Sequence, residues 1–303
     1  MKKIAVTTSS FAKENHAPVD MLRKGGFQII MNERGRKLSK EETFSLCNGC
    51  AGIVAGTEIY DKDLLTRLTG LKVISRCGAG MENVDLSAAK ELGIQVLNTP
   101  SGPTPAVAEL AIALILNLLR KVSEMDRGIR TGKWDKKMGN LLSGKRVGII
   151  GFGRIGQKVA GLLKCFGCEI SYADIVPKGD IAGFKYMTME KLLENSDIVS
   201  IHVSAGDEIL NAKRLRQMKK GAFIINMSRG EVIDEDALFN ALKDGHLGGA
   251  GLDVFRTEPY NGPLKELDNV ILTPHVGSYA FEARIGMEIE AVENLLKNLK
   301  GAV

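Results

Sequence analysis

The sequence predicts an α/β protein of two domains, one of them inserted into the chain of the other. Short apolar runs that suit buried strands alternate with amphipathic helical patterns over most of the 303 residues. A glycine-rich turn that normally opens a doubly wound parallel-sheet domain lies almost halfway along the chain, at 151–156. The chain closes with an amphipathic helix at 281–299. We therefore expect a first domain of residues 1–98 plus 281–303 and a second domain of residues 99–280.

The first 97 residues have the pattern of an α/β unit. Apolar runs predict strands at 4–6, 51–55, 72–75 and 94–97, and helical spacing lies between them at 18–24, 40–46, 62–68 and 86–92. The proline-rich segment 98–105 follows, and we expect extended chain there, at a domain boundary. The apolar segment 106–119 predicts a buried helix in a cytoplasmic protein, because a membrane span needs about 20 residues.

The glycine-rich turn GFGRIG is the first candidate site. It follows an apolar strand at 147–150 and precedes helical spacing at 157–164, which is the context that a dinucleotide-binding turn requires. The first glycine permits a tight turn, the second lets a pyrophosphate approach the backbone, and the third brings helix and strand together. The helix N-terminus then offers N–H groups to the phosphates. The residues that we expect to bind the cofactor here are Gly151, Gly153, Arg154, Ile155 and Gly156.

A carboxylate follows at the expected distance. The next strand, 168–173, ends at Asp174, which lies 18 residues after Gly156. An acid at this spacing binds the ribose hydroxyls and repels the additional phosphate of NADP. We therefore expect NAD as the cofactor, although the nearby Lys178 weakens that preference.

Three further polar residues follow predicted strands of the second domain. The strands lie at 197–201, 222–227, 249–254 and 270–273, with a helix at 234–242. The three residues after the strand ends are Arg229, Glu258 and His275. Ligands of open α/β sheets bind at the carboxyl ends of the strands, so we expect all three on the side of the glycine-rich turn.

The chemistry of these three side chains is complementary. Removing a hydride from an alcohol carbon also requires a base for the hydroxyl proton, and imidazole titrates near the working pH. A carboxylate orients the imidazole, and a guanidinium binds a substrate carboxylate through two hydrogen bonds and polarises the adjacent carbonyl. Taken singly, each residue is as compatible with a structural role as with catalysis. Together they predict His275 as acid/base, Glu258 as its partner and Arg229 as the substrate-binding cation.

The other three histidines are weaker candidates for the base. His16 lies in a polar loop and His246 in an exposed turn. His202 ends the strand DIVSIH, which we expect on the adenosine side of the sheet.

Composition excludes several classes of function. The net charge is +5, from 41 basic and 36 acidic residues, and the charges are interspersed, so we expect no nucleic-acid partner. We expect no leader peptide and no membrane association. The five cysteines include two C-x-x-C pairs, at 47–50 and 165–168, whose separation of 114 residues does not fit a zinc ribbon. We expect ordinary thiols and no metal.

Six segments together resemble the D-isomer-specific 2-hydroxyacid dehydrogenase family over essentially the whole chain. They are SRCGAGMENVDL (75–86), NTPSGPTPAVAEL (98–110), GIIGFGRIG (148–156), NMSRGEVIDEDAL (226–238), GAGLDVFRTEP (249–259) and LTPHVGS (272–278). The resemblance implies a Rossmann NAD domain inserted into a flavodoxin-like substrate domain, with the last helix crossing back. It gives Arg229, Glu258 and His275 the roles described above.

The resemblance implies further site residues. Backbone amides around Gly78, Ala79 and Gly80 would bind the substrate carboxylate, with Arg76 and Cys77 beside them. The helix at 106–119 resembles the family's dimer-interface helix, which implies a homodimer. The residues that the resemblance places at the cofactor, beyond the glycine-rich turn, are Val107, His202, Val203, Met227, Ser228, Asp253 and Gly277.

Within the family, the chain most resembles short-form D-3-phosphoglycerate dehydrogenases. Arg76 matches a position that those enzymes use, and Lys136 and Lys137 lie near the position where the partner subunit contributes charge. VAGTE (54–58) departs from the phosphoglycerate pattern, because Ala55 removes a guanidinium and Glu58 adds a negative charge.

Alternative substrates and an alternative role therefore stay open. Hydroxypyruvate or glyoxylate reduction is the first alternative. HVSAGDEIL (202–210) departs from the family's usual adenosine-pocket loop. A second alternative is an NADH-sensing binding protein of the same fold, as in the C-terminal-binding-protein corepressors.

Overall fold

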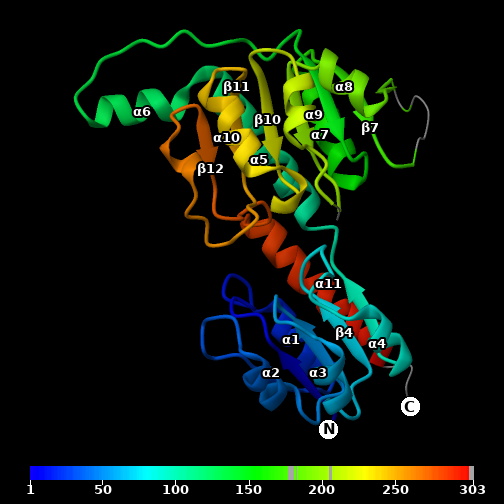
Figure 1. Ribbon diagram of the computed structural model, residues 1–303. Coiled ribbons are helices and arrows are strands. Elements are labelled where there is room, and N and C mark those ends of the chain that lie inside the picture. The colour runs from blue at the N-terminus through cyan, green and yellow to red at the C-terminus, as the bar shows by residue number, and fades with distance from the viewer. Residues whose placement is uncertain (177–180, 182, 205–206, 300–303) are drawn as a thin grey trace. The chain divides into compact units, whose positions relative to one another are not determined.

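The computed structural model describes residues 1–176, 181, 183–204 and 207–299. The chain divides into two compact units (Figure 1). Unit 1 consists of Met1–Pro103 and Ser278–Val303, and unit 2 consists of Thr104–Gly277. Each unit is built around one parallel sheet, so the chain is an α/β protein as predicted.

The sheet of unit 1 has the strand order β2-β1-β3-β4-β5, with every neighbouring pair parallel. This is the flavodoxin-like order that the resemblance implied. Its strands are β1 (Lys3–Val6), β2 (Gln28–Met31), β3 (Gly52–Ala55), β4 (Val73–Arg76) and β5 (Gln95–Asn98). The sequence did not predict β2. It is an edge strand without a fully buried residue, so its apolar signal is short and weak.

Five helices cover the two faces of this sheet. They are α1 (Ala17–Lys24), α2 (Lys40–Cys47), α3 (Lys62–Arg67), α4 (Leu86–Glu91) and α11 (Phe281–Leu299). Helices α1 and α11 pack on one face, where Val292 and Leu295 join Val54 and Val73 in the core. Helices α2, α3 and α4 cover the other face. The last helix of the chain therefore belongs to unit 1.

The sheet of unit 2 has the strand order β12-β11-β10-β9-β6-β7-β8. Its strands are β6 (Arg146–Ile150), β7 (Glu169–Ala173), β8 (Lys185–Tyr186), β9 (Ile198–Ile201), β10 (Ala222–Asn226), β11 (Leu247–Leu252) and β12 (Val270–Leu272). All pairs are parallel, and the order reverses between β6 and β9. This is the doubly wound topology predicted from the glycine-rich turn, and ligands of such sheets bind at the point of reversal.

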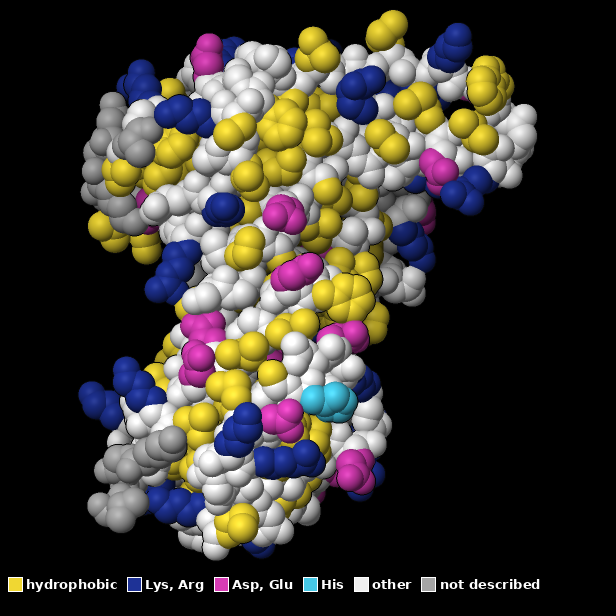
Figure 2. Space-filling view, turned by 180° about the vertical axis from the view of Figure 1, so that it is seen from behind, with side chains coloured by type: hydrophobic (Ala, Val, Ile, Leu, Met, Phe, Trp, Pro, Cys, Tyr) yellow, Lys and Arg dark blue, Asp and Glu magenta, His cyan; other side chains and the backbone are white. Residues whose placement is uncertain are grey.

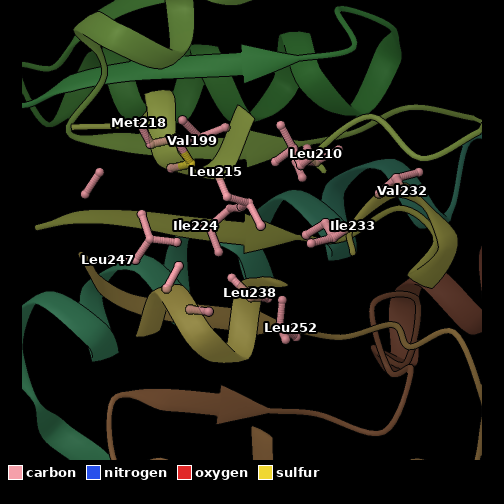
Figure 3. Packing of buried hydrophobic residues seen from close by; sticks show 14 of the residues in the cluster. Val199, Leu210, Leu215, Met218, Ile224, Val232, Ile233, Leu238, Leu247 and Leu252 are labelled. Carbon is pink, nitrogen blue, oxygen red and sulfur yellow. The ribbon is translucent and has the colours of Figure 1, made fainter. Parts of the chain in front are cut away.

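Helices cover both faces of this sheet too. They are α5 (Pro103–Arg120), α7 (Arg154–Cys165), α8 (Met189–Asn195), α9 (Ala212–Gln217) and α10 (Glu235–Lys243). Unit 2 also contains α6 (Val122–Arg130), which buries no residue, and the short 3-10 turns η1 (Gly230–Val232) and η2 (Pro263–Glu266). One face packs against α8, α9 and α10 through a cluster that includes Val199, Ile224, Leu215 and Leu238 (Figure 3). The other face packs against α5 and α7. The apolar strands are buried because both faces are covered.

Two expectations about the segment between the sheets are wrong. Extended chain was expected through residue 105, but α5 begins at Pro103. Proline is tolerated in the first turn of a helix because N–H groups there have no intrahelical acceptor. Helix α6 was not predicted either, and it buries no residue.

Helix α5 has the length and composition of a membrane span. Its 18 residues have a mean hydropathy of 1.3, and half of the helix is buried within the structure. Ala108, Ala111, Ile115 and Leu119 pack into the core of unit 2. Core helices of globular domains meet the same criteria, and this packing is of that kind.

Candidate active site

The carboxyl edge of the unit 2 sheet collects most of the predicted site residues. Strands β9, β10, β11 and β12 are consecutive parallel neighbours. The loops after β10, β11 and β12 carry Arg229, Glu258 and His275, respectively. The three side chains therefore follow three adjacent strands at one edge of the sheet.

A different feature of the structure explains why each of these positions in the turn between β6 and α7 is a glycine. A Cβ on Gly156 would lie 2.1 Å from the carbonyl oxygen of Gly151, so the helix approaches the turn too closely for any side chain. Gly151 has φ +87°, and a Cβ there would lie 2.7 Å from the carbonyl oxygen of His202. A Cβ on Gly153, in contrast, would meet no atom within 4 Å. The open space at Gly153, at the N-terminus of α7, fits a phosphate group.

The carboxylate of Asp174 faces this turn. Its Oδ2 accepts a hydrogen bond of 2.7 Å from Phe152 N, and its Oδ1 accepts one of 3.1 Å from Val176 N. Arg154 and Ile155 are the first two residues of α7. The residues at the turn therefore fit a dinucleotide. Lys178 lies outside the described residues, as do residues 205 and 206 of the departing loop.

His202 directly follows strand β9, which was expected on the adenosine side of the sheet. Strand β9 pairs with β6 and β10, so it is the first strand beyond the reversal point. The backbone of His202 and Val203 nevertheless lies against Gly151. The His202 ring is buried, with Nε2 2.7 Å from Ser200 Oγ, and its Nδ1 has no partner among the described residues. Burial lowers the pKa of His202 to about 3.

Four predicted cofactor residues meet around Gly277. A Cβ on Gly277 would lie 3.0 Å from Asp253 Oδ2, 3.2 Å from Val107 Cγ2 and 3.6 Å from Met227 Cε. These residues come from α5 and from the ends of β10, β11 and β12. The structure thus brings together residues that are far apart in the sequence.

Asp253 holds the loop that carries His275. Its Oδ1 accepts hydrogen bonds from Thr273 Oγ1 (2.6 Å) and Val276 N (2.8 Å), and its Oδ2 accepts one from Gly277 N (2.8 Å). His275, between these contacts, has φ +54°, which is uncommon for a residue other than glycine. Such a conformation persists only where the surroundings determine it, and here the buried carboxylate of Asp253 does so.

His275 and Glu258 form a dyad. His275 Nδ1 lies 2.9 Å from Glu258 Oε2, and Glu258 Oε1 accepts a 3.1 Å hydrogen bond from Phe255 N. The carboxylate fixes a proton on Nδ1, so Nε2 is the nitrogen that exchanges protons with a ligand. The dyad lines a hollow of about 580 Å³ together with Phe255, Pro259, Tyr260 and Lys265.

The loop that carries Arg229 is held by Asn226. The Oδ1 of Asn226 accepts hydrogen bonds from both N and Oγ of Ser228, and its Nδ2 donates to the carbonyl oxygen of Arg229 at 2.9 Å. A Cβ on Gly230 would lie 1.9 Å from the carbonyl carbon of Phe255. The Arg229 loop is therefore packed directly against the segment that leads to Glu258.

Unit 1 contains the residues expected to bind a substrate carboxylate. Arg76 ends β4, and its guanidinium donates to the carbonyl oxygen of Cys77 and, from Nε, to Asn83 Oδ1 at 3.3 Å. The N–H of Gly78 donates to Thr99 Oγ1 at 2.7 Å. Ala79 is exposed and Gly80 partly so. Glu58, expected to place a charge nearby, is buried and accepts a 2.6 Å hydrogen bond from Thr7 Oγ1.

Several residues that organise these loops were missed from the sequence. They are Asn83, Asn98, Thr99, Asn226 and Thr273. Four of them end a strand or follow one directly, which is the signal used to choose Arg229, Glu258 and His275. Among the described residues, no group of three or more His, Cys, Asp or Glu side chains is placed to hold a metal, and the five cysteines are free.

Comparison with known proteins adds a family model. The model for the "D-isomer specific 2-hydroxyacid dehydrogenase, NAD binding domain" matches residues 112–277. A glyoxylate reductase of Thermofilum pendens is 43% identical over 260 residues, covering 81% of this chain and 77% of that protein. A hydroxypyruvate reductase of Thermotoga maritima is 37% identical and covers 92% of this chain and 96% of that protein.

A D-3-phosphoglycerate dehydrogenase of Archaeoglobus fulgidus is 35% identical over 93% of this chain, which spans 55% of that longer protein. Among solved structures, the TT0316 protein of Thermus thermophilus superimposes with a TM-score of 0.91 at 36% identity. The superposition covers 99% of this chain and 97% of that one.

Proposed function

Because the chain belongs to the D-isomer-specific 2-hydroxyacid dehydrogenase family, we propose that it uses NADH to reduce a small, unphosphorylated 2-oxo acid, such as glyoxylate or hydroxypyruvate. The family makes it an NAD-dependent oxidoreductase. The observation that carries the proposal is the His275–Glu258 dyad, with Arg229 in the loop of a neighbouring strand. This set suits proton transfer to the oxygen of a carbonyl group whose carbon receives a hydride.

NAD(H) supplies the hydride when it is bound. The chain would hold its phosphates at the N-terminus of α7 beside Gly153, and its ribose at Asp174. The cluster around Gly277 would hold the nicotinamide.

The chain's own residues would manage the proton and the charge. Glu258 keeps the His275 ring oriented through the contact with Nδ1. His275 then donates a proton from Nε2 to the carbonyl oxygen during reduction, and accepts it in the reverse reaction. Arg229 would bind the substrate carboxylate and polarise the carbonyl, which lowers the cost of negative charge on the oxygen.

Three observations favour an unphosphorylated substrate. The guanidinium of Arg76, the cation expected to meet a phosphate, already donates to Cys77 O and Asn83. Lys137 pairs with Glu124 at 2.9 Å. The glyoxylate and hydroxypyruvate reductases named above have higher identity than the phosphoglycerate dehydrogenase. D-3-phosphoglycerate oxidation remains the second candidate, supported by that relative and by the position of Arg76.

We also propose that the protein is a cytoplasmic homodimer, with an interface in the α5 region. The space-filling view shows hydrophobic side chains at the surface over much of one face (Figure 2). Exposed large apolar side chains concentrate on α6 and the segment after it: Val122, Ile129, Trp134, Met138 and Leu141. Free cysteines suit a reducing compartment.

The test is NADH oxidation by the purified protein with glyoxylate, hydroxypyruvate and 3-phosphohydroxypyruvate in parallel. We expect kcat/KM for one of the two unphosphorylated acids to exceed that for the phosphorylated acid at least about tenfold, which is about 1.4 kcal/mol. The reverse preference would establish the phosphoglycerate reaction. Tight NADH binding without turnover of any 2-oxo acid would instead indicate a sensor.

A further inference from the structure

The loop after β4 is joined to the end of β5 by side chains, and we propose that Thr99, with Asn98, positions this loop so that Ala79 and Gly80 bind the substrate carboxylate. This inference rests on the proposed function and specifies how the acid is bound. It makes Thr99 a positioning residue that sets substrate affinity.

Four hydrogen bonds join the two segments, one of which Thr99 Oγ1 donates to Arg76 O at 3.4 Å. Thr99 Oγ1 accepts from Gly78 N at 2.7 Å, and Thr99 N donates to Gly78 O at 3.0 Å. Asn98 Nδ2 donates to Ala79 O at 2.7 Å. Both polar groups of the Gly78 backbone are therefore fixed by one residue, and the next peptide carbonyl is fixed by its neighbour.

The Thr99 side chain is rigidly held itself, because the residue is completely buried. Gly78 has φ +147°, and a Cβ there would lie 2.6 Å from Arg76 Nη1. The loop conformation thus requires glycine at 78 and an acceptor at 99. Neither requirement comes from regular secondary structure.

The pairing determines which N–H groups are left for a ligand. Because the N–H group of Gly78 already donates to Thr99 Oγ1, it is not available to a carboxylate. The N–H groups of Ala79 and Gly80 donate to no protein acceptor within the part of the chain that the structure describes. Successive backbone N–H groups in a turn bind anions. These two consecutive donors are the ones that we assign to the substrate carboxylate.

The end of β5 is itself anchored. Asn294, on α11, donates from Nδ2 to Asn98 O at 3.2 Å and contacts Ser75 Oγ at 3.4 Å. The last helix of the chain therefore links the ends of β4 and β5. This link keeps Asn98 and Thr99 in place beneath the loop.

The test compares three variants with the wild type: Thr99→Val, Thr99→Ser and Asn98→Ala. Thr99→Val keeps the shape but removes the acceptor for Gly78 N, and we expect KM for the 2-oxo acid to rise about tenfold. We expect kcat and the affinity for NADH to stay within about twofold, because neither depends on this loop. Thr99→Ser restores the hydroxyl and the wild-type KM. Asn98→Ala, at a less buried site, raises KM by a smaller factor.

Thr43→Val is the matched control. Thr43 is also buried in unit 1, and its Oγ1 donates to Ser39 O at 2.8 Å, but it lies on α2. If the wild type is active but KM is unchanged in Thr99→Val and Asn98→Ala, the inference about Thr99 is overturned while the proposed function stands. An equal rise in KM in Thr43→Val would overturn it as well. A wild type that neither turns over nor binds any small 2-oxo acid with NADH would overturn the proposed function and this inference with it.

Discussion

The two loops that carry the proposed substrate-binding groups are built in different ways. The loop 76–80 of unit 1 presents backbone N–H groups, and its shape is fixed by hydrogen bonds from Thr99 and Asn98. The loop 273–277 of unit 2 presents the imidazole of His275, and its shape is fixed by the carboxylate of Asp253. Each loop is thus held by a buried side chain that is not itself the presented group.

This difference teaches that the group presented to the substrate and the residue that holds its loop affect activity in different ways. Loss of the presented imidazole removes a group that acts on the reacting atoms, so it should change the rate. Loss of the holding residue in unit 1 should change substrate affinity instead. The comparison can be tested by replacing each kind of residue.

The largest expected effect comes from the presented side chain of unit 2. His275→Gln keeps a polar group of similar size but cannot act as an acid or base, so kcat should fall by about 10²–10⁴-fold. Steady-state kinetics with NADH and the preferred 2-oxo acid measure this. His246→Gln is the control, because His246 lies in a turn and contacts Leu215 O. A fall in kcat of less than about tenfold in His275→Gln would mean that another group transfers the proton.

Within the glycine-rich turn, one glycine is needed for packing and another leaves room for the ligand. Gly156→Ala places a Cβ 2.1 Å from the Gly151 carbonyl oxygen, so we expect about 3 kcal/mol of lost stability, measured by denaturant unfolding. Gly153→Ala meets no atom within 4 Å and should leave stability unchanged while weakening NADH binding, measured by fluorescence titration. Equal loss of stability in both variants would contradict the assignment of Gly153 to the ligand.

The sequence indicated the groups that the loops are proposed to present, but not the residues that hold those loops. The glycine-rich turn was recognisable because its glycines are required by local backbone geometry and occur at fixed spacing. Arg229, Glu258 and His275 were recognisable because their chemistry is distinctive and each follows a strand. The doubly wound topology of unit 2 was predicted from the glycine-rich turn, whereas the flavodoxin-like sheet of unit 1 was implied only by the family resemblance.

The holding residues were not predicted, because their roles depend on contacts between distant segments. Thr99 is 21 positions from Gly78, and Asp253 reaches residues more than 20 positions away. Asp253 was placed at the cofactor by resemblance, and its hydrogen bonds to the His275 loop are visible only in the structure. Edge strand β2 was missed for a different reason, because its apolar run is short and none of its residues is fully buried. Helix α6, which buries no residue, was also missed.

Asp253→Asn tests the holding residue of unit 2. An amide has one acceptor oxygen, so its NH₂ group would face at least one of the three donors that Asp253 now satisfies. We expect a loss of about 2 kcal/mol in the free energy of unfolding, together with a lower kcat because His275 is no longer fixed. Asp234→Asn is the control, since Asp234 caps α10 in the same unit and asparagine caps equally well. A wild-type kcat in Asp253→Asn would show that the loop needs no carboxylate.

His202 comes last because its expected effect is on stability below pH 6.5 alone, and it sharpens the comparison because it lies at the same sheet edge but is already buried. The folded state holds it neutral, with a pKa of about 3 against 6.5 for the unfolded chain. Below pH 6.5 the unfolded state therefore binds a proton that the folded state does not, and stability should fall by about 1.4 kcal/mol for each unit of pH. Above pH 6.5 neither state binds the proton, so His202 contributes no pH dependence there. His202→Gln should lose this slope between pH 6.5 and 4, measured as the difference between its unfolding free energies and those of the wild type. Parallel curves for the two proteins would mean that His202 is solvated and able to meet a ligand as His275 does.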